Sequence, residues 1–141
     1  MSTNCVFCRI IARELPASIV FENDEVIAIM DIQPINPGHV LVIPKTHYAS
    51  LREVPDELGG QLFKVVAAVE KALWKTSGIR CEGTNILQNN GQSAWQDVFH
   101  VHFHVIPRFE GDAFRIKIPR NLPERTALDH LSQQIGLHVS P

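Results

Sequence analysis

The sequence lacks any run of apolar residues long enough to cross a lipid bilayer, which takes about 18 residues. It also lacks a cluster of lysine and arginine of the kind that binds nucleic-acid phosphates, and its formal net charge is only −2. The N-terminus has neither the charged nor the apolar region of a secretory signal peptide. We therefore expect a cytoplasmic protein with no membrane and no nucleic-acid partner.

Cysteine is scarce as well, with three in the chain, and in the cytosol these thiols should be reduced rather than paired in disulfides. The sequence has no internal repeat and no low-complexity segment. Its 141 residues suit one domain with a proper core, so we expect residues 1–141 to form a single domain.

A long amphipathic helix is the clearest element that the sequence does contain. Pro55 suits its first turn, Lys75 its last turn and Gly78 its C-terminal cap. Phe63 and Trp74 in this segment are expected in the core or at an interface. The other apolar residues recur at helical spacing and should form one buried stripe. These are Leu58, Leu62, Val65, Val69 and Leu73.

Short apolar runs bounded by turn residues predict five strands, at 19–22, 26–30, 39–43, 84–88 and 98–108. A short helix at 7–14 and a last helix at 123–134 complete the pattern. Strands both precede and follow the long helix. This order predicts an α+β fold, with a mainly antiparallel five-stranded sheet, one long helix and short terminal helices.

Histidine recurs at alternate positions of the last predicted strand, at His100, His102 and His104. Alternate residues of a strand share one face, so the three rings should stand in a row while the apolar residues between them face the core. Ordinary packing is the alternative, but it rarely places three such groups together. Imidazole acts as base, nucleophile or metal ligand near neutral pH, so the row indicates a reactive site.

Spacing along the row limits what it can do. Residues two apart on a strand are separated by about 6.6 Å, so three rings in a row cannot share one tetrahedral metal without strong distortion. His102, in the middle, is the best nucleophile, because one ring nitrogen can attack if the other donates its proton to a fixed acceptor such as the carbonyl of His100. The polar loop 89–93, followed by Gln96, suits an anion site or a plain polar turn.

Residues 100–106 match the signature of the histidine-triad nucleotide-binding family, His-φ-His-φ-His-φ-φ with φ apolar. The resemblance covers nearly the whole chain. Residues 5–11 resemble the start of the family's zinc-bearing bacterial branch, 21–24 and 30–32 its first hairpin, and 39–47 its third strand. It implies the histidine-triad fold, a homodimer with sheets joined edge to edge, and a purine nucleotide or nucleotide conjugate as ligand.

The resemblance also implies catalytic roles. His102 would attack the α-phosphorus of the nucleotide and form a nucleotidyl-histidine, which water would resolve to release the nucleoside monophosphate. His39 would lie beside the row and support it electrostatically. Asn89, Gln96 and His104 would contact the phosphate or the leaving group.

The nucleoside would be held by an acid and an apolar slot. Asp31 would accept hydrogen bonds from the ribose hydroxyls, or else be a turn-initiating acid only. The slot for the base would be formed by Phe7, Ile11, Ile29 and Ile32. Ordinary core packing is the alternative for Ile11 and Ile29.

One position departs from the family pattern. Many members have Ser or Thr where this chain has Asp97. An ionised carboxylate cannot donate a hydrogen bond to phosphate, so the hydroxyl contact is lost and Asp97 is expected to point away.

Cys5 and Cys8 form a C-x-x-C pair, which is typical of a redox pair or of half a zinc site. A redox pair opens a helix within a βαβ pattern, and no strand precedes this one. Zinc prefers four nitrogen or sulfur ligands, and His47 and His100 are the natural candidates to complete the set, the same pair that the zinc-bearing members of the family imply. Cys81 has no partner at such spacing and is expected to be a buried thiol.

Different functions are open at this point. The leading hypothesis is a hydrolase or phosphoramidase that cleaves a nucleoside monophosphate from a leaving group through a nucleotidyl-histidine. A related one is a dinucleoside polyphosphate hydrolase. A third is a hydrolase whose catalytic zinc is held by two strand histidines and which a chelator would inactivate. The last is a nucleotide-binding adaptor with little turnover.

Overall fold

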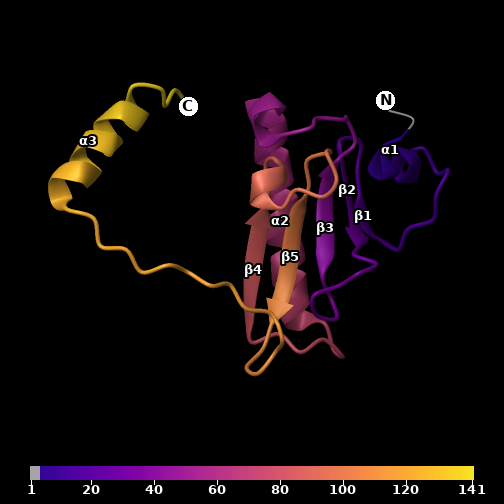
Figure 1. Ribbon diagram of the computed structural model, residues 1–141. Coiled ribbons are helices and arrows are strands. Elements are labelled where there is room, and N and C mark those ends of the chain that lie inside the picture. The colour runs from indigo at the N-terminus through magenta and orange to yellow at the C-terminus, as the bar shows by residue number, and fades with distance from the viewer. Residues whose placement is uncertain (1–3) are drawn as a thin grey trace.

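The computed structural model describes residues 4–141, and the first three residues, part of the N-terminus expected to lack a signal peptide, lie outside this range. Five strands form one antiparallel sheet in the order β1-β2-β3-β5-β4 (Figure 1). The strands are β1 (Ile19–Glu22), β2 (Val26–Met30), β3 (Val40–Pro44), β4 (Gly83–Gln88) and β5 (Phe103–Arg108). The helices are α1 (Val6–Ile11), α2 (Asp56–Lys75) and α3 (Arg125–Gly136), with short 3-10 turns at Leu51–Glu53 and Gln92–Ala94. The predicted fold class and sheet are confirmed.

The two faces of the sheet bury different helices. In β2, Val26 and Ala28 pack with α2, whereas Ile27 and Ile29 pack with α1 on the other face. This follows from the period of two along a strand, since both faces of β2 are covered and the whole strand is therefore apolar. The α1 face is the one that carries the histidines, because His104 of β5 lies opposite Leu41 of β3, which packs with α1.

Helix α2 buries the predicted apolar stripe, which is confirmed. The helix ends at Lys75 with Thr76 as its cap, so Gly78, at φ +87°, lies in the turn beyond the cap rather than at it. Phe63 and Trp74 are 65% and 52% exposed, so neither lies in the core of the chain, and the expected place at an interface stays a prediction. Both lie off the buried stripe, and the indole of Trp74 donates to Glu70 one turn earlier.

The ends of helices α1 and α3 differ from the sequence prediction. Helix α1 stops at Ile11 rather than Glu14, because Arg13 takes a left-handed φ of 63°. The last helix runs two residues past its predicted end. It has no buried residue and stands apart from the sheet after the irregular segment 114–124 (Figure 1). No helix of residues 4–141 combines the length and apolar character needed to cross a bilayer.

Candidate functional site

The histidine row begins before the strand that was expected to carry all of it. Strand β5 starts at Phe103, so only His104 lies on it, and the expected strand from residue 98 is wrong for 98–102. The reason is that the main chain finds partners outside the sheet, with the N–H of Val101 donating to the carbonyl of Tyr48 at 2.8 Å. The rings still gather. The centroids of His102 and His104 are 4.9 Å apart, and the Phe7 ring lies 5.1 Å from that of His102.

The Nδ1 atom of His102 lies 2.7 Å from the main-chain oxygen of His100, as predicted. A carbonyl oxygen only accepts hydrogen bonds, so Nδ1 carries the ring proton and donates it there. In the neutral ring, the lone pair is therefore on Nε2. His102 is 3% exposed and lines a cavity, so this lone pair belongs to a ring that is fixed by a buried hydrogen bond.

A second chain of hydrogen bonds sets the proton on His104. The N–H of Ile35 donates to Nδ1 of His39 at 3.0 Å, which leaves the proton of a neutral His39 on Nε2. That Nε2 lies 2.9 Å from Nδ1 of His104, which must therefore accept, so the proton of a neutral His104 is on Nε2. The predicted place of His39 beside the row is seen, and its effect is to fix both rings.

Burial keeps these two rings neutral. It lowers the pKa of His104 to about 4, and the neighbouring His102 and His39 lower it further. Burial also lowers the pKa of His39, against the opposing effect of the Asp31 carboxylate. Because both pKa values lie below 6.5, the proton positions deduced from the hydrogen bonds apply at neutral pH.

A cavity of about 400 Å³ opens on the α1 face beside His102 and His104. Phe7, Ile29 and Ile32 line it. Ile11, the fourth residue of the expected slot, is not among its lining residues and packs against the core under α1, so the core alternative is the correct one for it. The chemistry of the wall suits a flat apolar group held by a few polar atoms.

Asp31 forms part of the wall of the same cavity. Its Oδ1 accepts from the N–H of Gln33 at 2.8 Å, which is the turn role considered above. Its Oδ2 lies 3.5 Å from Nε2 of His39. One oxygen therefore holds the turn while the other faces the histidines, and the two roles are compatible.

The loop before the histidines is held by Gln96. This side chain is 4% exposed, accepts from the N–H of Gly91 at 2.7 Å and donates to the carbonyl of Ala49 at 2.7 Å. Asn89 donates only a 3.5 Å bond to the carbonyl of Trp95, and it lines a smaller cavity together with His104. Neither residue lines the larger cavity.

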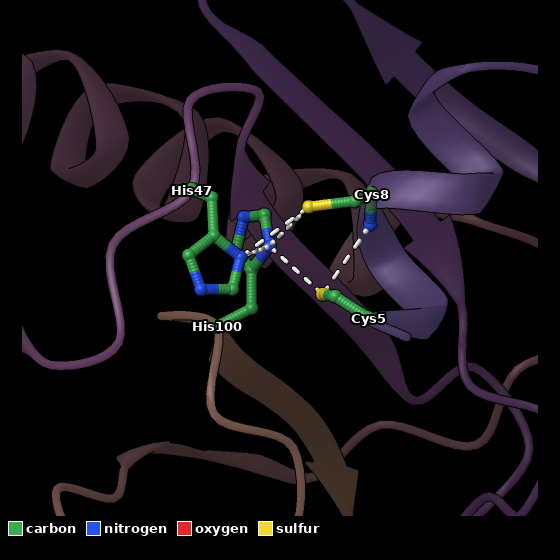
Figure 2. A group of neighbouring side chains, drawn as sticks. All are labelled: Cys5, Cys8, His47 and His100. Carbon is green, nitrogen blue, oxygen red and sulfur yellow. Dashed lines mark hydrogen bonds between the residues drawn. The ribbon is translucent and has the colours of Figure 1, made fainter. Parts of the chain in front are cut away.

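The cysteines and two histidines form a separate cluster (Figure 2). Nδ1 of His100 lies 3.4 Å from Sγ of Cys5 and 3.6 Å from Sγ of Cys8, and Nδ1 of His47 lies 3.3 Å from Sγ of Cys8. The two Nδ1 atoms are 3.2 Å apart. Sulfur and nitrogen atoms around a tetrahedral zinc are separated by about 3.3–3.8 Å, so the cluster has the dimensions of a metal site.

Protonation of His100 suits the same purpose. Its Nε2 lies 2.8 Å from the carbonyl of Pro44 and must donate to it, which leaves Nδ1 unprotonated and directed at the cysteines. Burial lowers the pKa of His100 to about 4, so the ring is neutral. Cys81 is apart from the cluster, and its thiol is partly rather than fully buried, with burial raising its pKa.

Comparison with known proteins agrees with this arrangement. The family described as HIT domain matches residues 12–111. The chain belongs to the HIT family. The crystal structure of a HIT family member from Bacillus subtilis has a TM-score of 0.91, with 38% identity, over 98% of this chain and 99% of that one. That of a Zn-bound histidine triad family protein from Mycobacterium smegmatis has a TM-score of 0.71, with 36% identity, over 95% and 99%.

Two similar HIT proteins have names that state an activity. The adenosine 5′-monophosphoramidase HNT1 of Candida albicans is 43% identical over 107 residues, 74% of this chain and 70% of that protein. The adenylylsulfatase HINT3 of Arabidopsis thaliana is 39% identical over 112 residues, 79% of this chain and 56% of that protein.

Asp97 of this HIT protein is directed at His102. Its Oδ1 lies 3.6 Å from Nε2 of His102, although the side chain is 77% exposed. The prediction that Asp97 points away is therefore wrong. The N–H of Val98 donates to the same carboxylate at 2.9 Å, which turns it back over the histidine. The signal in the sequence was the presence of Asp where many family members have Ser or Thr. It was interpreted only as the loss of a hydrogen bond to phosphate.

Proposed function

We propose that this HIT protein is a nucleotidyl hydrolase that cleaves nucleoside 5′-phosphoramidates through an intermediate on His102. The observation that carries the proposal is the hydrogen bond from Nδ1 of His102 to the carbonyl of His100, which leaves Nε2 as the nucleophilic atom at the cavity. The neutral His104 beside it, held in turn by the buried His39, is what a transfer of a phosphoryl group needs for positioning and proton supply.

The reaction has two steps. Nε2 of His102 forms a bond to the α-phosphorus as the phosphorus–nitrogen bond of the substrate breaks. The departing amine keeps the bonding electron pair and takes up a proton, for which we propose the Nε2–H of His104. Water then attacks the same phosphorus and gives up a proton, which returns to Nε2 of His104; the phosphorus–histidine bond breaks, the nucleoside monophosphate is released and both histidines are restored.

The binding roles follow the walls of the cavity. Phe7, Ile29 and Ile32 would pack against a purine base, and Asp31 would accept from the ribose hydroxyls with its Oδ2. Asn89, whose amide makes only the long bond to Trp95, is the loop residue that we assign to the phosphate. Gln96, whose amide is already occupied, would shape the loop and reach the phosphate only by giving up a present bond.

We also propose that Cys5, Cys8, His47 and His100 hold one zinc ion. The tetrahedral spacing of their ligand atoms, the free Nδ1 of His100 and the Zn-bound relative support this assignment. When bound, zinc would supply a cross-link between α1 and the segment that precedes β5. His102 is outside the ligand set, so the metal would be structural.

A homodimer is the assembly that we propose. Strand β4 is at an edge of the sheet and pairs only with β5 among the described residues, so its other side presents unpaired main-chain groups. Edge-to-edge pairing of two copies would satisfy them. Light scattering of the protein in solution should give twice the mass of one chain, and a monomer at micromolar concentration would contradict this.

Hydrolysis assays separate the alternatives. The protein is incubated with adenosine 5′-phosphoramidate, adenylyl sulfate and diadenosine tetraphosphate, with and without a chelator, and release of adenosine monophosphate is measured. We expect the fastest turnover with the phosphoramidate and no immediate loss with the chelator. A preference for the tetraphosphate favours a dinucleoside polyphosphate hydrolase, immediate loss a catalytic zinc, and negligible turnover of all three an adaptor.

A further inference from the structure

Fixed charge around the proposed nucleophile is negative only. Asp31 and Asp97 are in the wall of the nucleotide cavity, and among residues 4–141 no lysine or arginine lines it. No described lysine or arginine lines the neighbouring cavity of about 420 Å³ either, which shares Val6, Asp97 and Val98 with it. No described lysine or arginine forms an ion pair with Asp97, whose other partner is the N–H of Val98. No described lysine or arginine therefore compensates its charge at the site.

Position makes this charge relevant to the leaving group. Oδ1 of Asp97 lies 3.6 Å from Nε2 of His102, and the residue forms part of the boundary between the two cavities. Resting on the proposed function, we infer that Asp97 selects the leaving group by charge. The site takes phosphoramidates whose amine carries a further positive group and discriminates against sulfate, polyphosphate and carboxylate-bearing leaving groups.

The physical basis is that the substrate must supply the positive charge that the walls lack. A nucleotide already brings a negative phosphate close to two carboxylates, and an anionic leaving group adds to the repulsion. At a partly exposed site, the interaction of two charges about 6 Å apart changes an equilibrium or rate constant by about three- to tenfold. Replacing an anion by a cation changes the interaction energy by twice that of adding one charge. Added salt should weaken the selection, since Asp97 is exposed.

Three adenosine 5′-phosphoramidates test the inference. Their amines are 1,3-diaminopropane, propylamine and β-alanine, so the leaving groups have similar length and carry a positive, a neutral and a negative end. The charged end takes no part in the step, in which the phosphorus–nitrogen bond breaks and the amine leaves with the electron pair and a proton. Differences in kcat/KM therefore report on the field around the leaving group.

The wild type should prefer the cationic over the anionic compound. In Asp97→Asn and Asp97→Ser this ratio of kcat/KM should fall by about tenfold at low salt, while the neutral compound changes least. Asp24→Asn is the matched control, because Asp24 is exposed at the opposite end of β2 from Asp31. A ratio that stays within about twofold of wild type in both Asp97 variants, as in the control, overturns the inference.

Equilibrium binding keeps the inference distinct from the proposed reaction. The same three compounds are titrated into His102→Ala protein with and without Asp97→Asn. A shift in the affinity ratio with no turnover by the wild type would retain the charge selection and overturn the proposed hydrolysis. Turnover by the wild type with unchanged ratios in both assays would retain the hydrolysis and overturn the role of Asp97.

Discussion

The main-chain carbonyl of His100 accepts the ring proton of His102 at 2.7 Å, while the ring of His100 itself is directed at the cysteine pair. One residue therefore serves both centres of the molecule. Its side chain belongs to the cluster that we assign to zinc, and its main chain sets the tautomer of the proposed nucleophile. This relationship links the stability of the metal cluster to the geometry of the reactive ring.

Replacing His102 tests the nucleophile. His102→Ala should lose turnover of adenosine 5′-phosphoramidate by at least about a thousandfold, because covalent catalysis is lost, and yet bind adenosine monophosphate because the cavity remains. Steady-state kinetics and calorimetric titration measure the two properties. His130→Ala, on the exposed helix α3, is the matched control. Retention of more than about a tenth of the wild-type rate would point to another nucleophile, because it corresponds to an increase of less than about 1.4 kcal/mol in the activation barrier.

Changing one atom of Asp31 tests recognition of the sugar. Hydrogen bonds to charged groups contribute about 1.5–3 kcal/mol, so Asp31→Asn should weaken binding of adenosine monophosphate by about tenfold or more. Binding of the 2′,3′-dideoxy analogue, which has no ribose hydroxyls, should change little. Calorimetry with both ligands decides the question. Equal losses would show that Asp31 supports only the turn to Gln33.

Metal content and thermal stability test the cysteine cluster. Protein purified without chelator should contain about one zinc per chain by elemental analysis. Cys8→Ala should lose the metal. Because the metal contributes several kcal/mol to the free energy of unfolding, its loss should lower the melting temperature by about 10 °C or more. Cys81→Ala, outside the cluster, should keep both. Zinc-free wild-type protein would refute the assignment.

Acid titration tests the burial of His104. Its pKa is lowered to about 4 by burial, whereas a histidine in the unfolded chain titrates near about 6.5. Between these values the unfolded chain binds a proton that the folded chain does not, so the free energy of unfolding falls as the pH falls through this window. His104→Asn lacks this component.

The stability difference between wild type and His104→Asn should therefore narrow on acidification from pH 6.5 towards 4. Urea denaturation at several pH values measures it, and acid loss of metal, common to both proteins, cancels in the difference. His130→Asn is the control, because it shows whether loss of an exposed histidine is enough to narrow the difference in the free energy of unfolding from the wild type. A difference that stays constant from pH 7 to 4 contradicts the deduced burial of His104.

The fold was accessible from local patterns because each pattern is caused by burial on one or two faces. The stripe from Leu58 to Leu73 predicts the buried side of α2, and the apolar run 26–30 predicts a strand, β2, which the structure shows to be covered on both faces. The start of β5 was not accessible. Alternation of apolar and polar residues extends back through residues 99–102. In the structure, however, the N–H of Val101 donates to the carbonyl of Tyr48, and no local pattern indicates a hydrogen bond to a residue so distant in sequence.

The same distinction holds for the site. The spacing of the histidines and the C-x-x-C pair indicate which residues react, and the structure brings Cys5, Cys8, His47 and His100 together as expected. It does not bring Gln96 to the nucleotide cavity, because the side-chain amide of Gln96 is hydrogen-bonded to the N–H of Gly91 and the carbonyl of Ala49. Ala49 is distant from Gln96 in sequence, and the loop turns Gly91 towards it. The direction of Asp97 likewise depends on the turn at Val98.

The covalent intermediate on His102 is the central feature of the proposed function. Its direct test is the intact mass of the protein, quenched in the first seconds of reaction with adenosine 5′-phosphoramidate, followed by mapping of the modified peptide. We expect a species heavier by one adenylyl group, located on His102 and absent from His102→Ala. Turnover at the wild-type rate with no adduct on His102 at any quench time would contradict it.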